Sequence, residues 1–472
     1  MRLQAGGSEF GVMFEFGREL RRLFGADSLN APRDGLTGGD SSLLELLDLN
    51  LLQQEAKACD VAAGRVGAKD RAQRRLEAAI TWREVARRSG DAAALRKAAA
   101  NAETAATLFD RNRRPDGWAR ARCEQAFCAL LGAELFGDEG LDAAAGAAFK
   151  DAYAAARGGL AKPLAEIGMV ATEGRARLAD GDAQTARVVS ARFATPIAGL
   201  QTLTRRCRAA RLLAVEARLI RADLLLGWGV RLADRDLILR ALAEADAAGL
   251  DLEVDYEPLS FARVAAMRGQ ALTLLGEVTG QVETVIDGVN VLAEVLDELT
   301  RDQSPLDWAR AQTALARGLQ VLGEASVSER AYEQAVTCYD RAVMVLKDAP
   351  ALALRAMATS NRALCLARSA ELSGDLTVLD AAEAAFRIEL SQISANRDPV
   401  AWALLQVNLA RLYESRVEIT GRDRGERAAA ATALSAALDV FAEQGLRSLS
   451  IVASDALERL AEGSSSRARP AA

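Results

Sequence analysis

The sequence predicts an all-α fold, an α-solenoid of about eight antiparallel helix pairs, and three observations support this prediction. Half of the 472 residues are hydrophobic, mostly Ala and Leu, which have high helix propensities. Prolines recur at 115, 163, 258, 305 and 399, separated by one or two steps of about 47 residues. Trp308 and Trp402 each follow one of these prolines by three residues. A regular period of this length is typical of helical repeat arrays.

The period also predicts where the helices begin and end. A proline at the first position of a helix loses no hydrogen bond and presets φ, so each recurring proline marks the start of a pair. First helices are expected to begin near 68, 115, 163, 211, 258, 305, 352 and 399. Glycines followed by an acidic residue are expected to end five of them, at Gly137, Gly181, Gly276, Gly323 and Gly374. Pro196 does not fit the period, which indicates a longer loop between Pro163 and Arg211.

The pattern divides the chain into five segments. Residues 1–40 are expected to be flexible, with a short amphipathic helix at Met13–Gly25, and 41–66 to form an N-terminal capping helix. Residues 67–445 form the repeat array, 446–462 a C-terminal capping helix and 463–472 a disordered tail. The helix at 13–25 places four apolar residues on one face: Phe16, Leu20, Leu23 and Phe24. It is expected either to dock on the first repeat or to bind a partner or a membrane surface.

Two recurring patterns describe how the helices of a pair pack. One position of the first helices holds a small residue in copy after copy: Ala126, Gly269, Ala316, Ala363 and Ala410. A small residue at a fixed place lets the partner helix approach closely. One first helix also carries Leu409 before this position and Tyr413 after it. A second helix carries the pattern Ala335-x3-Tyr339-x2-Ala342.

These patterns resemble the tetratricopeptide repeat (TPR) family, whose motifs run W-x2-L-G-x2-Y and then A-x3-F-x2-A. The chain departs from the family at the Trp position, which holds Gln312 and Gln406, and in its period of 47 instead of 34 residues. HEAT-like repeats remain the structural alternative. The resemblance implies a TPR-like superhelix whose concave groove binds an extended peptide or a partner helix.

The composition excludes several classes of function. The chain has no histidine, which excludes Ser-His-Asp and Cys-His catalysis and histidine-ligated metals. No C-x-x-C motif joins the six cysteines, which favours free thiols in a reducing compartment, so we expect a cytoplasmic protein without metal or cofactor. The net charge of −6 argues against nucleic-acid binding. No uncharged apolar stretch of about 18 residues is present, so no membrane-spanning helix is expected.

Paired carboxylates and tryptophans are the remaining candidates for chemistry. Four acidic residues alternate with apolar ones just before Pro258: Asp251, Glu253, Asp255 and Glu257. We expect them to form a solvated turn and not a pair like that of a retaining glycosidase. Trp308 and Trp402 are expected to be core wedges between adjacent helix pairs, not platforms for a ligand.

The predicted function is therefore a non-enzymatic scaffold or adaptor that binds a peptide or partner protein in the concave groove. Polar residues of the first helices that the core does not need are the candidate contacts: Arg310, Gln312, Arg317, Asn361, Arg362, Gln406, Asn408 and Arg411. The alternative is that they only solvate the surface. Two other functions stay open. One is an adaptor anchored to a membrane or complex through Met13–Gly25, and the other is a helper subunit of a bacterial modifying or secretion system. The sequence predicts neither the partner nor the oligomeric state.

Overall fold

A computed structural model describes residues 42–465, apart from 206, 208, 348, 394, 396–398 and 445–446. The described part of the chain is all-α and contains no strand, as the composition predicts. The amphipathic segment Met13–Gly25 and most of the predicted tail lie outside the described residues. The last helix continues to Ser465, three residues into that tail. The division into caps and array remains our proposal.

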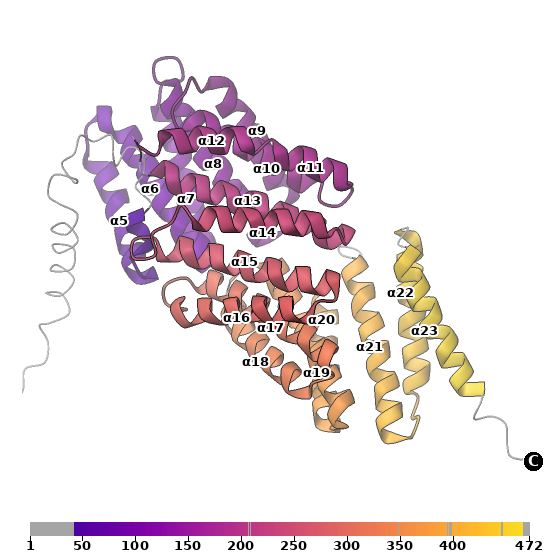
Figure 1. Cartoon of the computed structure of the whole chain (residues 1–472). Coiled ribbons are helices and arrows are strands. Elements are labelled where there is room, and N and C mark those ends of the chain that lie inside the picture. The colour runs from indigo at the N-terminus through magenta and orange to yellow at the C-terminus, as the bar shows by residue number, and fades with distance from the viewer. Residues whose placement is uncertain are drawn as a thin grey trace, which may run out of the picture.

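The described residues form eight helix pairs in series, which confirms the predicted architecture (Figure 1). The first helices of the pairs are α6 (Ala68–Ser89), α8 (Pro115–Phe136), α10 (Ala161–Ala176), α13 (Ala209–Leu232), α15 (Pro258–Thr279), α17 (Pro305–Ser326), α19 (Leu352–Ser373) and α21 (Pro399–Thr420). The second helices are α7 (Ala92–Leu108), α9 (Glu139–Ala155), α11 (Ala183–Ala191) with α12 (Ala194–Leu203), α14 (Arg235–Gly249), α16 (Val282–Glu298), α18 (Glu329–Leu346), α20 (Leu376–Gln392) and α22 (Glu426–Glu443).

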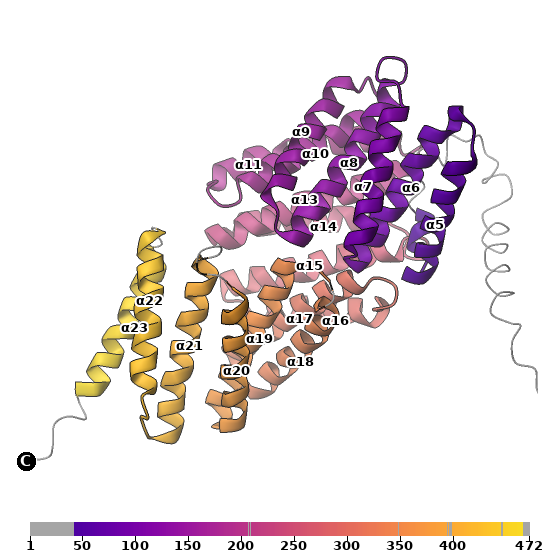
Figure 2. The same cartoon turned by 180° about the vertical axis from the view of Figure 1, so that it is seen from behind.

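Three further helices flank the pairs. Helices α4 (Ser42–Glu45) and α5 (Leu49–Arg65) precede the array, and α23 (Arg447–Ser465) follows it. Figures 1 and 2 show α21, α22 and α23 on the opposite side of the molecule from α5.

The helix starts confirm the 47-residue period. Pro115, Pro258 and Pro305 occupy the first turn of α8, α15 and α17, where the missing N–H costs nothing. Where the period lacks a proline, α13 and α19 begin at Ala209 and Leu352, within two residues of the expected positions.

The third pair differs from the prediction of a longer loop. Its second helix is broken into α11 and α12, and Pro196 lies in the first turn of α12, where it is buried. A proline in a first turn removes only an N–H that has no partner within the helix, so it starts the extra helix instead of opening a loop.

Two of the five predicted glycine caps are confirmed. Gly137 and Gly374 end α8 and α19 with φ of 65° and 69°. The prediction is wrong for Gly181, which lies beyond the end of α10 and directly before Asp182, the residue that caps α11.

Gly276 and Gly323 are also not caps, because they lie inside α15 and α17. A Cβ on Gly276 would lie 2.5 Å from Val285 Cγ2, and one on Gly323 would lie 3.1 Å from the Tyr332 ring. These glycines therefore allow the second helix of the pair to approach closely. The helices end a few residues later, in left-handed conformations.

The residues that carry the TPR resemblance pack as that resemblance implies. Ala335, Tyr339 and Ala342 are fully buried in one hydrophobic cluster. Trp308 packs among residues of α15, α16 and α17, which confirms its predicted role as a wedge between adjacent pairs. Trp402 packs against a cluster formed by its own pair, α21 and α22, and by α23, so its predicted role as a wedge between two pairs stays a prediction.

The array curls until its first pair meets its sixth. Helix α6 contacts α17, and one hydrophobic cluster contains Trp82 and Leu95 of the first pair together with Leu306 and Leu346 of the sixth. A Cβ on Gly90, in the turn between α6 and α7, would lie 3.0 Å from the Cβ of Ala349. The first six pairs therefore form one closed turn, which the 47-residue period alone did not predict.

The segment 44–49, here called the N-terminal clasp, bridges this closure. The guanidinium of Arg88, which is fully buried, donates to the carbonyl oxygens of Leu44 and Leu47, each at 2.8 Å. The Leu49 N–H donates to the Asp302 carbonyl oxygen at 3.1 Å. The clasp thus joins the end of α6 to the loop before α17.

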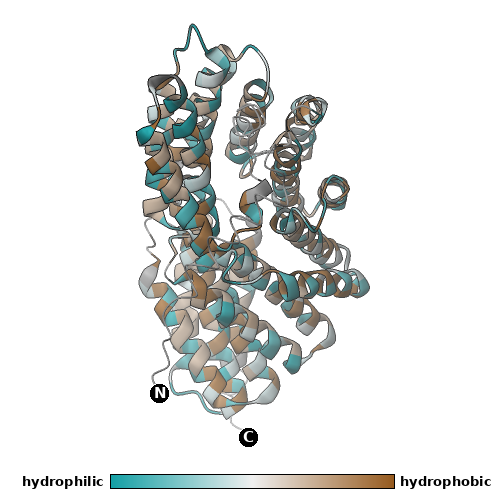
Figure 3. Cartoon of the chain, turned by 90° about the vertical axis from the view of Figure 1, so that its left-hand side faces the viewer, coloured by the Kyte–Doolittle hydropathy of each residue, from teal (hydrophilic) through white to brown (hydrophobic). Residues whose placement is uncertain are grey.

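Apolar and polar residues interleave along the helices (Figure 3). Within the described residues, no helix is both long and apolar enough to cross a membrane.

Candidate functional site

The first helices of the six pairs in the closed turn surround a cavity of about 480 Å³, here called the central cavity. Its apolar lining includes Phe127, Leu130, Leu131, Leu178, Leu219, Ile220, Leu224 and Met267. Its charged lining is Arg83, Arg87, Glu134, Arg175, Glu216, Asp223, Arg263, Asp307 and Arg310. Both kinds of side chain therefore face one space, which is partly open to solvent.

The lining follows the repeat period. Glu216, Arg263 and Arg310 lie 47 residues apart, at the same position of α13, α15 and α17. Ile220 and Met267 lie four residues after the first two of them and line the same cavity. Residues spaced by three or four lie on one face of a helix, so each first helix turns this face toward the cavity.

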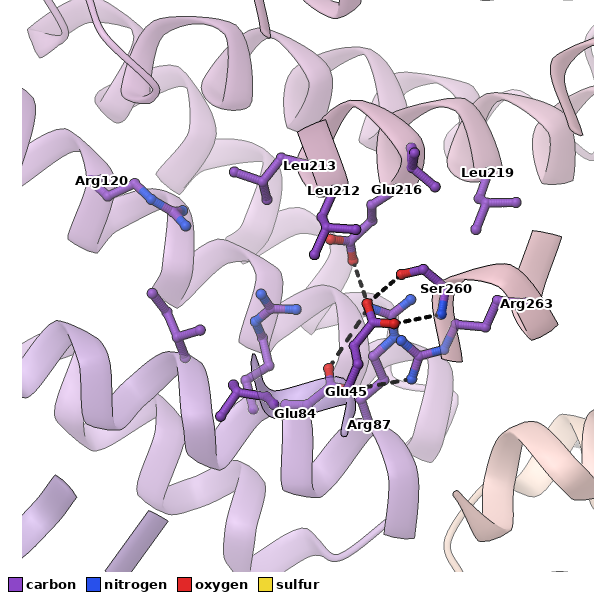
Figure 4. A pocket seen from close by; sticks show the side chains of 14 residues that line it. Glu45, Glu84, Arg87, Arg120, Leu212, Leu213, Glu216, Leu219, Ser260 and Arg263 are labelled. Carbon is purple, nitrogen blue, oxygen red and sulfur yellow. Dashed lines mark hydrogen bonds and ion pairs between the residues drawn. The ribbon is translucent and has the colours of Figure 1, made fainter. Parts of the chain in front are cut away.

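A network of ion pairs crosses the closure. Arg263 Nη2 lies 2.7 Å from Asp307 Oδ2 and 3.3 Å from Glu84 Oε1, which joins α15 to α17 and to α6. Arg310 extends the network from Asp307, at 3.2 Å, to Glu134 on α8. Figure 4 shows Glu84, Arg87, Glu216 and Arg263 gathered at this junction.

The charges of the network set the ionisation of its acids. Burial opposes the ionisation of Glu84, but the charges of Arg263, Arg88 and Arg87 outweigh it and lower the pKa of Glu84 to about 2. Burial of Asp307 is outweighed in the same way by Arg263 and Arg310, so its pKa is also lowered. Both carboxylates are therefore ionised near neutral pH.

The N-terminal clasp covers one end of the central cavity. A small cavity of about 50 Å³ lies beneath Leu44 and Glu45. It shares five lining residues with the central cavity: Arg83, Arg87, Glu216, Leu219 and Arg263. Glu45 points into this junction in Figure 4 and is 5% exposed.

Asp223 is the exception to the pairing of charges in the central cavity. Among the described residues, its carboxylate takes part in no hydrogen bond and no ion pair, although the side chain is accessible from the cavity. Although the side chain is exposed to the cavity, the protein packed around Asp223 raises its pKa and the charge of Glu134 raises it further, whereas Arg175 and Arg310 act in the opposite direction. The cavity thus holds one acid whose charge is not compensated by a direct contact.

One of the eight residues predicted from the sequence lines the central cavity, namely Arg310. The prediction for Gln312 is corrected, because this side chain is buried in α17 and only 3% exposed. Its Oε1 has no hydrogen-bond partner. Position 312 faces the packed interior because it is offset by two residues from Arg310, about half a turn around the helix.

The other six predicted residues lie outside the central cavity. Arg317 pairs with Glu277 at 2.9 Å, Arg362 with Asp340 and Arg411 with Glu371. The half-buried residues Asn361, Gln406 and Asn408 lie on α19 and α21, beyond the closed turn. The structure therefore does not bring the predicted set together at one site.

The acidic turn before α15 is only partly as predicted. Glu253 is exposed, but Glu257 is completely buried and pairs with Arg211. Glu257 is therefore a structural partner of the preceding repeat and not part of a solvated turn.

Most residues of the central cavity were not among the sequence candidates. A comparison of equivalent positions in the repeats would have identified Glu216 and Arg263, since both are equivalent to Arg310.

All six cysteines are free. In the described part of the chain, no group of three or more His, Cys, Asp or Glu is placed to hold a metal ion.

These features define an all-α helical-repeat protein of TPR-like architecture. The chain is similar in structure to a Rap protein complexed with competence and sporulation factor, with 10% identity, a TM-score of 0.46 and coverage of 82% of this chain and 96% of that one. It is also similar to a circular tandem repeat protein, with 17% identity, a TM-score of 0.26 and coverage of 88% and 95%. It is similar as well to the TPR domain of P58(IPK), with 13% identity, a TM-score of 0.21 and coverage of 87% of this chain and 98% of that one. No family model and no curated protein matches the sequence.

Proposed function

We propose that this protein is a non-enzymatic interaction scaffold that binds a peptide, or an extended segment of a partner protein, in the central cavity. The observation that carries the proposal is a cavity of about 480 Å³ that six first helices line with both apolar and charged side chains. Ligand sites usually have volumes of about 300–1,000 Å³ and combine an apolar lining with a few polar groups.

The chemistry of the cavity favours a protein ligand over a nucleic acid. Its arginines are engaged by acids of the chain, as in the pair between Arg87 and Glu216 at 2.9 Å and the pair between Arg263 and Asp307. Few cationic groups are therefore left for phosphates, which dominate binding to nucleic acids. The proposal includes the cytoplasmic location that the free cysteines favour.

Filling the cavity tests the proposal. Ala266 and Ala314 line the cavity on α15 and α17, and a tryptophan at either position would occupy it. Ala100 on α7 is exposed outside the cavity, so Ala100→Trp is a matched control. The full-length protein and each variant serve as bait, and the recovered proteins are identified by mass spectrometry.

We expect the wild type and Ala100→Trp to recover the same partners, and Ala266→Trp and Ala314→Trp to lose them. Recovery of the same set by all four baits would overturn the central cavity as the binding site. Circular dichroism of each bait shows that the helices are intact.

A further inference from the structure

Among the charged residues that line the central cavity, one acid, Asp223, forms no ion pair. The five arginines of the lining and its other three acids all take part in ion pairs. Arg175, the arginine on α10, pairs with Asp142 at 3.4 Å and not with Asp223. The protein therefore satisfies its own charges throughout the lining except at Asp223.

The repeat period explains why the chain itself supplies no partner. The position of Asp223 on α13 corresponds to Gln270 on α15, which lines the cavity and carries no charge. The next copy is Arg317 on α17, whose guanidinium is engaged by Glu277 at 2.9 Å. No neighbouring repeat thus places a free cation beside Asp223.

The surroundings of Asp223 combine charged and apolar side chains: Glu134, Arg175 and Arg310 act on its charge from other helices without a direct contact. Ile220 and Leu224 flank it on α13, and Leu178 lies on the chain just after α10; all three line the same cavity. The side chain of Asp223 is exposed to the cavity, so a cation carried by a ligand can reach its carboxylate and form an ion pair with it.

We propose that the central cavity selects peptides that carry a lysine or arginine side chain next to apolar residues, and that Asp223 is the specificity-determining partner of that positive charge. This inference rests on the proposed function, since it names the chemistry of the ligand for the same cavity. A bare metal ion fits less well, because the described residues place no group of three potential ligands together.

A selection from a pool of peptides tests this proposal. The full-length protein is immobilised and incubated with random heptapeptides that are acetylated and amidated, and bound peptides are sequenced by mass spectrometry. The same selection uses Asp223→Asn, Ala314→Trp and a matched control, Asp236→Asn, which neutralises an exposed acid on α14 outside the cavity. Asp223→Asn breaks no contact among the described residues, so its melting temperature should not fall.

We expect the wild type and Asp236→Asn to enrich peptides with Lys or Arg beside apolar residues, and Asp223→Asn to lose the basic preference. For one enriched peptide, replacing Arg by the neutral isostere citrulline should weaken binding to the wild type by roughly two- to fivefold, and binding to Asp223→Asn hardly at all. Peptides enriched without a basic residue, or equally by Asp223→Asn, overturn the inference and leave the proposed function standing. If the wild type enriches no peptide relative to Ala314→Trp, both the inference and the proposed function are overturned.

Discussion

The carboxylate of Glu45 accepts hydrogen bonds from the backbone N–H and the hydroxyl of Ser260, at 2.8 and 2.5 Å, across a separation of 215 residues. Both groups of Ser260 lie in the first turn of α15, where a backbone N–H has no partner within its own helix. Glu45 therefore caps the fifth pair from the other side of the closure. The relationship makes the N-terminal clasp part of the closed turn.

Removing the Glu45 side chain should loosen this closure. Glu45→Ala leaves a buried donor without an acceptor, which costs about 1–3 kcal/mol of the free energy of unfolding. Urea denaturation measures the loss, and hydrogen exchange should become faster in the first turn of α15. Glu103→Ala, at an exposed position of α7, is the control. Equal stability of the two variants would show that the clasp does not hold the turn closed.

Neutralising Glu84 should destabilise the protein more strongly. Its carboxylate pairs with Arg88, at 2.8 Å, and with Arg263, at 3.3 Å, and Arg88 is fully buried. Breaking a buried ion pair by removing one partner costs about 3–5 kcal/mol, because a charge is left without compensation. Glu84→Gln should therefore lower the midpoint of urea denaturation at neutral pH.

The same acid gives this loss a defined dependence on pH. Although burial opposes ionisation, Arg263, Arg88 and Arg87 lower the folded-state pKa of Glu84 from 4.5 to about 2. A lowered pKa means that the stabilisation is complete above about pH 4.5 and is lost as the pH falls toward 2. The difference in stability between wild type and Glu84→Gln should shrink over this range. A difference that is constant from pH 7 to pH 3 would contradict the assignment.

Val327 should be a site where glycine stabilises the fold. It ends α17 in a left-handed conformation, with φ of 50° and ψ of 46°, and it is 70% exposed. The corresponding residues 47 positions away on either side are Gly280 and Gly374, each with φ of 69°. The left-handed conformation costs a residue with a Cβ about 1–2 kcal/mol, part of which is offset by the greater freedom of glycine in the unfolded chain.

Val327→Gly should therefore raise the free energy of unfolding by about 1 kcal/mol, as measured by thermal denaturation. Gly280→Val is the reverse experiment, since nothing lies within 4 Å of a Cβ at Gly280 and only the backbone opposes the change. A loss of stability in Val327→Gly would contradict the prediction.

Two glycines of the second and third pairs should respond to alanine in opposite directions. A Cβ on Gly168 in α10 would lie 2.3 Å from the ring of Phe149, which is fully buried, so Gly168→Ala should cost about 1–3 kcal/mol. A Cβ on Gly146 in α9 would meet nothing closer than 3.6 Å. Gly146→Ala should stabilise by about 0.5–1 kcal/mol through helix propensity. Thermal denaturation of both variants checks the pair, and a shift in the same direction would contradict it.

The parts of the fold that depend on local signals were predictable from the sequence. Pro115, Pro258 and Pro305 fix helix starts through their own φ and missing N–H, so the period led directly to α8, α15 and α17. The glycine caps were harder to predict, because a glycine near a helix end can either adopt the left-handed conformation that ends the helix or let a neighbouring helix approach closely. Gly276 serves the second purpose, against Val285, and nothing next to it in the sequence shows this.

The candidate site was less predictable because it depends on the curvature of the whole array. Small rotations between neighbouring pairs add up until α6 meets α17, and no single repeat encodes that sum. Arg310 was found because it is a polar residue of a first helix, but its partner Glu134 lies 176 residues away. Asp223 was missed because it is notable only for the absence of a contact, which requires the folded surroundings.

The contact between the turn at Gly90 and the residue Ala349 has a consequence for how the chain comes apart. In an open array, each helix pair contacts only its neighbours, so either end can unfold without disturbing the middle. Here the first pair also contacts the sixth, so the unfolding of any one of the six pairs removes its interfaces with two other pairs. We therefore expect the residues from α6 to α18 to unfold together, and α21, α22 and α23, which lie outside the closed turn, to unfold at a lower temperature.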